Sequence, residues 1–219
     1  MAERRLDHDR EVALEQLPSA IRPAFSALWK LDLAFADVVA TSTDPRLGAI
    51  RLAWWRERLE ELDEGAVTPA EPRLQAVITE LLPRGVSGKS LSGLEDAWLP
   101  LLDPFPWGKA VAEGLKLRGR ILFGIGAQLL GGDPADAEAA GAFWSLADGA
   151  QHCTDKASSD MLTHEAKLSR RELRGKLPRE VRPLTVLAAV AAADVHAGNG
   201  LARLVAAVRH RLFGTFPRS

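Results

Sequence analysis

The sequence predicts an all-α fold, a bundle of helices, and three observations support this prediction. Apolar residues recur at spacings of three and four along most of the chain, and Gly and Pro separate the periodic segments. No stretch shows the apolar–polar alternation that is typical of a strand. The 219 residues are expected to form one domain over 1–219. No repeat recurs at the roughly 30–45-residue period of helical solenoids.

Periodic apolar segments bounded by polar caps and prolines define the predicted helices. They span about residues 8–17, 19–41, 45–62, 73–82, 90–102, 107–130, 134–152, 179–196 and 199–213. Asp7 and Asp44 are suitable N-caps because a short carboxylate side chain can accept a hydrogen bond from the first helical turn. Pro23 and Pro45 fall in first turns, where a missing N–H breaks no helical hydrogen bond. Two glycines at 131–132 end the long helix before them.

Two further segments of the second half carry local signals. Residues 154–164 lack a clear apolar period and are predicted to be a loop. Ser169 followed by Glu172 forms a capping box, which predicts a short helix that begins there. The long predicted helix contains four glycines, Gly114, Gly119, Gly124 and Gly126. Because each costs roughly 1 kcal/mol against alanine, they indicate close approach of another helix or space for a ligand tail.

Composition excludes several classes of protein. Cys153 is the only cysteine, so an internal disulfide is impossible and a reducing compartment is favoured. The N-terminus is polar and has no apolar signal-peptide core. No stretch reaches the roughly 18 apolar residues of a membrane-spanning helix. We therefore expect a cytoplasmic protein.

Charge is distributed unevenly along the chain. Residues 163–219 hold 11 Lys/Arg and 4 Asp/Glu, whereas residues 1–162 hold 17 and 25. Three interpretations of this basic C-terminal region are open. It pairs with the acidic part of the chain, it is solvated, or it makes peripheral contact with an anionic membrane. The membrane reading involves the last predicted helix, with Arg203, Arg209, His210 and Arg211. No nucleic acid is expected as a partner, because no nucleic-acid-binding motif accompanies the charge.

The most distinctive stretch lies between residues 27 and 56. Its second half reads Asp44-Pro45-Arg46-Leu47-Gly48-Ala49-Ile50-Arg51-Leu52-Ala53-Trp54-Trp55-Arg56. It resembles the squalene/phytoene synthase family of head-to-head prenyltransferases, and in particular a short bacterial branch. The resemblance is specific over about residues 20–62 and weaker through Gly119–Gly131 and Gly141–Asp148. It implies the isoprenoid (terpenoid) synthase type of helical fold.

The resemblance also implies Mg²⁺ held by two Asp-rich motifs, because ionising an allylic diphosphate requires neutralisation of the leaving group. Asp37 alone remains where the first motif would lie, and it is a candidate catalytic residue and the candidate metal ligand of that motif. Asp148 and Asp155 are the candidates in the second. Seven residues separate these two, which places them two helical turns apart, too far to share one Mg²⁺. Asp37 has the alternative role of a solvated or ion-paired side chain.

Three basic residues are candidates for binding a prenyl diphosphate: Lys30, Arg51 and Arg56. Lys30 precedes Asp37 by seven residues, so both lie on one helix stripe. An arginine pointing into a cavity binds diphosphate through two parallel hydrogen bonds. Structural pairing of Arg51 or Arg56 with acids such as Asp37 is the competing interpretation. The two adjacent tryptophans are interpreted as core residues.

These features lead to two hypotheses from different classes. The first is a pseudoenzyme, a squalene/phytoene synthase-like protein without the full metal motifs, which binds an isoprenoid or another lipid, or acts with a protein partner as an assembly or scaffold factor. One branch of the family that resembles this pattern serves as an assembly factor of respiratory complex I. The alternative is an active prenyltransferase that condenses two prenyl diphosphates with Mg²⁺ on Asp37, Asp148 and Asp155.

Overall fold

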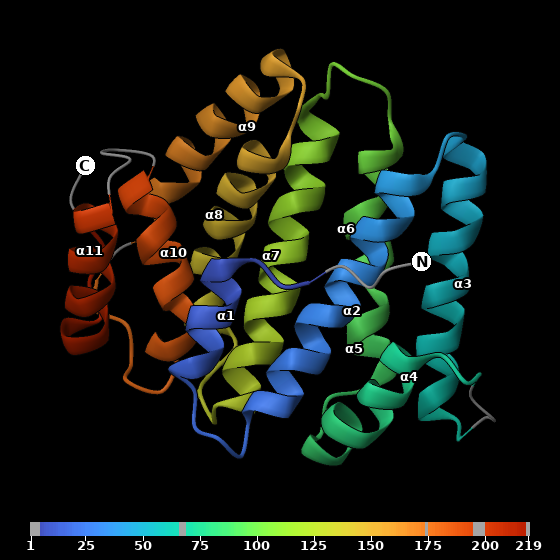
Figure 1. The fold of residues 1–219 in the computed structure, drawn as a ribbon, viewed down its shortest axis with the longest axis horizontal. Helices are drawn as coiled ribbons and strands as arrows, with labels where there is room; N and C mark the ends of the chain where they lie inside the picture. The colour runs from blue at the N-terminus through green and yellow to red at the C-terminus, as the bar shows by residue number, and fades with distance from the viewer. Residues whose placement is uncertain (1–4, 66–68, 174, 195–199, 218–219) are drawn as a thin grey trace. The chain divides into compact units, whose positions relative to one another are not determined.

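The computed structural model describes residues 5–65, 69–173, 175–194 and 200–217. Within these ranges every regular element is a helix, which confirms the predicted all-α class and is consistent with the isoprenoid synthase helical fold (Figure 1). The chain divides into two units, residues 1–104 and 105–219, and each is described by itself. One domain over 1–219 stays a prediction. In the described ranges, no helix combines the length and apolar character needed to cross a bilayer.

Unit 1 is built around its second helix. Its helices are α1 (His8–Glu15), α2 (Arg22–Thr41), α3 (Pro45–Asp63), α4 (Pro72–Ala76), α5 (Gly88–Ser92) and α6 (Leu94–Trp98). A π-helical turn, Val77–Leu81, and a short 3-10 turn, Leu82–Arg84, lead from α4 to α5, and a second 3-10 turn, Leu99–Leu102, follows α6. Helix α2 packs against α1, α3, α4 and α6. Its fully buried side chains include Phe25, Leu28, Trp29 and Phe35, so the predicted apolar stripe of this helix forms the core.

The predicted N-caps of α1 and α3 are confirmed, whereas the prediction that both tryptophans of α3 lie in the core is confirmed for one of them. The N-caps are confirmed, since Asp7 accepts from the Arg10 amide at 2.9 Å and Asp44 accepts from the Arg46 amide at 2.8 Å. Trp55 is buried, as the core interpretation predicts. Trp54, however, is 37% exposed, because the adjacent position points about 100° away on a helix.

Unit 2 consists of helices α7 (Lys109–Leu129), α8 (Ala135–His152), α9 (Lys156–Ser169), α10 (Arg182–Asp194) and α11 (Gly200–Phe213). The prediction of a loop over 154–164 is wrong, because α9 begins at Lys156 with Asp155 as its N-cap. The predicted helix start at Ser169 is also wrong. Ser169 ends α9 and is followed by a short 3-10 turn, Arg170–Glu172. The predicted break at Ala197 and Gly198 lies outside the described residues.

Helices α7 and α8 lie side by side along unit 2 (Figure 1). They approach most closely where Gly119 faces Gly141, and a Cβ on either residue would collide with the backbone carbonyl group of the other. Gly119 therefore serves close helix packing, one of the two interpretations of the glycine-rich helix. A Cβ on Gly124, in the same helix, would find its nearest neighbour at 3.6 Å, an ordinary contact.

The contrast between these two glycines gives a stability prediction. Gly119→Ala forces α7 and α8 apart and is expected to lower the free energy of unfolding by about 1–3 kcal/mol. Gly124→Ala is the matched control in the same helix, and its better helix propensity is expected to leave the stability equal or slightly higher. Urea unfolding followed by circular dichroism measures both variants. Equal stabilities of the two variants would contradict the close approach.

Candidate functional site

Asp37, the candidate metal ligand, is half-buried near the C-terminal end of α2. Its Oδ2 accepts a hydrogen bond from Nη2 of Arg73 at 3.0 Å, and Arg73 belongs to α4. Both side chains are mostly shielded from water. The guanidinium group therefore neutralises this carboxylate inside unit 1, which agrees with the ion-pair interpretation of Asp37.

The three basic candidates lie on α2 and α3. Lys30 is half-buried on α2. Arg51 is exposed, and its Nη1 donates to the hydroxyl groups of Thr41 and Ser42 at 3.1 and 3.2 Å, which ties α3 to the end of α2. Arg56 donates to Glu95 of α6 at 3.2 Å. A role of Lys30, Arg51 and Arg56 in substrate binding stays a prediction.

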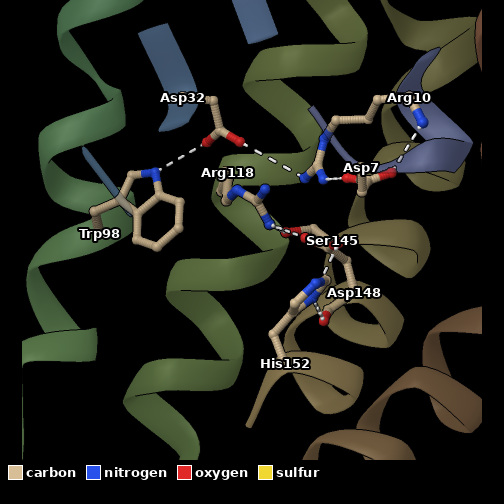
Figure 2. Close-up of polar contacts among 8 residues, drawn as sticks. All are labelled: Asp7, Arg10, Asp32, Trp98, Arg118, Ser145, Asp148 and His152. Carbon is tan, nitrogen blue, oxygen red and sulfur yellow. Dashed lines mark hydrogen bonds and ion pairs between the residues drawn. The ribbon is translucent and has the colours of Figure 1, made fainter. Parts of the chain in front are cut away.

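Asp148, in unit 2, is held by a buried arginine. Nη1 of Arg118, a residue of α7 that is 3% exposed, donates to Oδ2 of Asp148 at 2.9 Å. The same nitrogen lies 3.1 Å from the Ser145 hydroxyl group, and the guanidinium group lies 5.0 Å from the centroid of the Trp144 ring. His152, one turn further along α8, turns its ring toward Asp148 (Figure 2). Asp148 thus belongs to a polar cluster between α7 and α8, in which Arg118 is buried and His152 is exposed.

Asp155 has a local structural role. Its Oδ1 accepts hydrogen bonds from the Ser158 amide at 2.8 Å and the Ser158 hydroxyl group at 2.6 Å. These two bonds hold the pKa of the Asp155 carboxyl group below its ordinary value. Both contacts are those of an N-cap, so this carboxylate starts helix α9.

Asp32 was missed by the sequence reasoning, although it is the most deeply buried acid among the described residues of unit 1. It is 0% exposed, its Oδ1 accepts from the Trp98 indole N–H at 3.0 Å, and its Oδ2 lies 3.9 Å from Arg10 Nη2 (Figure 2). The available signal was its place in α2, four residues after Leu28 on the buried face. An acid on an apolar stripe indicates a paired, buried charge.

The carboxylates that resemble the family's motifs do not fit a Mg²⁺ site as they are arranged. Mg²⁺ takes several oxygen ligands in near-octahedral geometry. An arginine at hydrogen-bond distance from Asp37, and another from Asp148, would repel a dication there. In the part of the chain that the structure describes, no three His, Cys, Asp or Glu side chains are grouped so that they could hold a metal ion.

The buried position of Arg118 gives a second stability prediction. Asp148→Ala leaves this guanidinium group without its carboxylate and is expected to lower the free energy of unfolding by roughly 3 kcal/mol. Asp160→Ala is the control, because Asp160 pairs with Lys156 on the surface of α9 and such pairs contribute about 1 kcal/mol or less. Equal losses for both variants in urea unfolding would contradict a structural role of Asp148.

Comparison with known proteins gives a similarity over part of the chain. Residues 4–85 match the family model described as Squalene/phytoene synthase. No curated protein matches the chain, and no solved structure matches it. The matched segment contains Lys30, Asp37, Arg51 and Arg56, whereas Asp148 and Asp155 lie beyond it. Residues 4–85 are therefore similar to the squalene/phytoene synthase family, in agreement with the resemblance of α2 and α3, and the match does not distinguish between branches of the family.

Proposed function

We propose that the protein is a squalene/phytoene synthase-like pseudoenzyme that acts in isoprenoid binding or as an assembly or scaffold factor, similar to the complex I assembly factor branch. One observation carries the proposal. Asp37 and Asp148, the carboxylates expected to hold metal, each bind an arginine of their own unit, at 3.0 and 2.9 Å. The similarity of residues 4–85 to the family supports the isoprenoid part.

The physical argument concerns the charge that a prenyl diphosphate brings. Ionisation of the substrate requires cations that bridge carboxylates and diphosphate oxygens. A carboxylate paired with a guanidinium group forms an ion pair with no net charge, which attracts Mg²⁺ weakly, and separating the pair would leave a partly buried arginine without this carboxylate. This cost favours binding without turnover over transfer chemistry at these positions.

The exposed face of α3 favours the scaffold role within this proposal. Leu47, Ile50 and Trp54 are exposed and lie at spacings of three and four, so they share one stripe. The stripe belongs to the segment that matches the family. Exposed apolar stripes of this kind are typical of surfaces that dock other proteins.

The test measures ligand binding and turnover together. Equilibrium titrations with farnesyl and geranylgeranyl diphosphate are made with Mg²⁺ and with a chelator, and diphosphate release is followed in the same samples. The variants are wild type, Asp37→Ala and the surface control Asp160→Ala. We expect no diphosphate release, and affinities that agree within about twofold with and without Mg²⁺ in all three.

The opposite result is equally specific. Mg²⁺-dependent binding with diphosphate release, lost in Asp37→Ala and kept in Asp160→Ala, would contradict the proposal and support the active prenyltransferase with Mg²⁺ on Asp37, Asp148 and Asp155. Circular dichroism of each variant separates a lost site from a lost fold. The absence of binding to both diphosphates would leave the assembly role. The cytoplasmic location stays a prediction from the sequence.

A further inference from the structure

Helix α11, the last helix of unit 2, presents its apolar side chains to solvent. Five of them are between 51 and 72% exposed: Leu201, Leu204, Val205, Val208 and Leu212. At about 100° per residue they fall within one stripe of roughly 100°. A helix of a globular protein ordinarily turns such a stripe toward the core. Here the stripe is left uncovered by the residues that the structure describes.

The opposite face of α11 is the one that packs on α10, and its contacts are largely polar. Ala206 and His210 are buried, and His210 Nε2 lies 2.8 Å from the Thr185 hydroxyl group. Nη1 of Arg182 donates to the Leu212 carbonyl oxygen at 2.9 Å, and Arg203 pairs with Asp194 at 2.7 Å. Desolvation by burial lowers the pKa of His210 to about 4, so this face stays neutral at that position near pH 7. Helix α11 therefore packs on unit 2 through a largely polar face and presents its apolar face to solvent.

Positive charge borders the apolar stripe on both sides. Arg209 and Arg211 are exposed, and the helical period places them about 100° to one side and about 60° to the other side of Val208, near the stripe's centre. The sequence contains no Asp or Glu after Asp194. An apolar stripe with arginines along its borders and no acid fits the boundary between lipid headgroups and acyl chains. The arginine stems can lie along the apolar layer while their guanidinium groups reach phosphates.

We propose that α11 is a docking helix that lies in the plane of an anionic lipid surface, with the Leu201–Leu212 stripe in the acyl boundary and Arg209 and Arg211 at the lipid phosphates. Charge complementarity decides between this occupant and a second copy of the chain. A symmetric dimer through the same stripe would place the arginines of both copies along one apolar seam, with no acid on either α11 to meet them. The inference does not depend on the proposed function.

The test is co-sedimentation of the full chain with vesicles of phosphatidylcholine alone or mixed with phosphatidylserine. We expect binding to the mixed vesicles, weak binding to phosphatidylcholine alone, and weaker binding at higher salt. Val208→Glu is expected to reduce the affinity for mixed vesicles by at least about tenfold, since it places a charge at the stripe's centre. The double variant Arg209→Ala/Arg211→Ala is expected to reduce it by roughly tenfold to thirtyfold.

Leu117→Glu is the matched control, because it places the same charge on an exposed apolar side chain of α7, outside the α11 stripe, and is expected to leave vesicle binding unchanged. Circular dichroism and thermal unfolding verify that all variants are folded, as expected at exposed positions. Absence of binding to the mixed vesicles, or equal binding by wild type and Val208→Glu, would overturn the proposal. A dimer in analytical ultracentrifugation that Val208→Glu converts to a monomer would also overturn it, by assigning the stripe to a second copy.

Discussion

The close approach of α7 and α8 at Gly119 and Gly141 is the constraint from which the arrangement of unit 2 follows. Arg118 is the residue next to Gly119, and Ser145 and Asp148 lie four and seven residues after Gly141, on the same face of α8. Backbone contact between the two helices therefore brings the guanidinium group directly onto its hydroxyl and carboxylate partners. Because the pair is shielded from water, each partner depends on the other for compensation of its charge.

The shielded acids of unit 1 also have partners within their own unit. Asp32 is compensated by an indole N–H and lies near Arg10, and Asp37 is compensated by Arg73, which enters from α4. In both units, carboxylates on the inner helices have cationic or hydrogen-bonding partners from the same unit. The acids Asp37 and Asp148 thus join helices within their own units. Among the described residues, the apolar stripes of α3 and α11 are exposed.

Local signals predicted much of this structure, and nonlocal ones did not. The caps at Asp7 and Asp44 and the buried stripe of α2 could be found because each depends on residues within a few positions. The helix over 156–169 was missed because its polar first turn hides the Asp155–Ser158 cap, and Ser169 resembled a start although it is an end. The Asp37–Arg73 pair joins residues 36 positions apart, and the exposure of the α11 stripe depends on how α10 and α11 pack. Periodicity identifies a stripe but does not say whether it is covered.

The central claim is that Asp37 and Asp148 are structural partners of arginines and that Asp155 is a helix cap. Carbon-13 NMR of the Asp side-chain carboxyl groups tests this claim most directly. Mg²⁺ is titrated into the labelled protein in the presence of inorganic diphosphate, and the resonances of Asp37, Asp148 and Asp155 are followed. We predict no saturable shift of any of the three, because an arginine or a helix N-terminus already holds each carboxylate. A saturable shift of Asp37 together with Asp148 or Asp155, reversed by a chelator, would contradict the account.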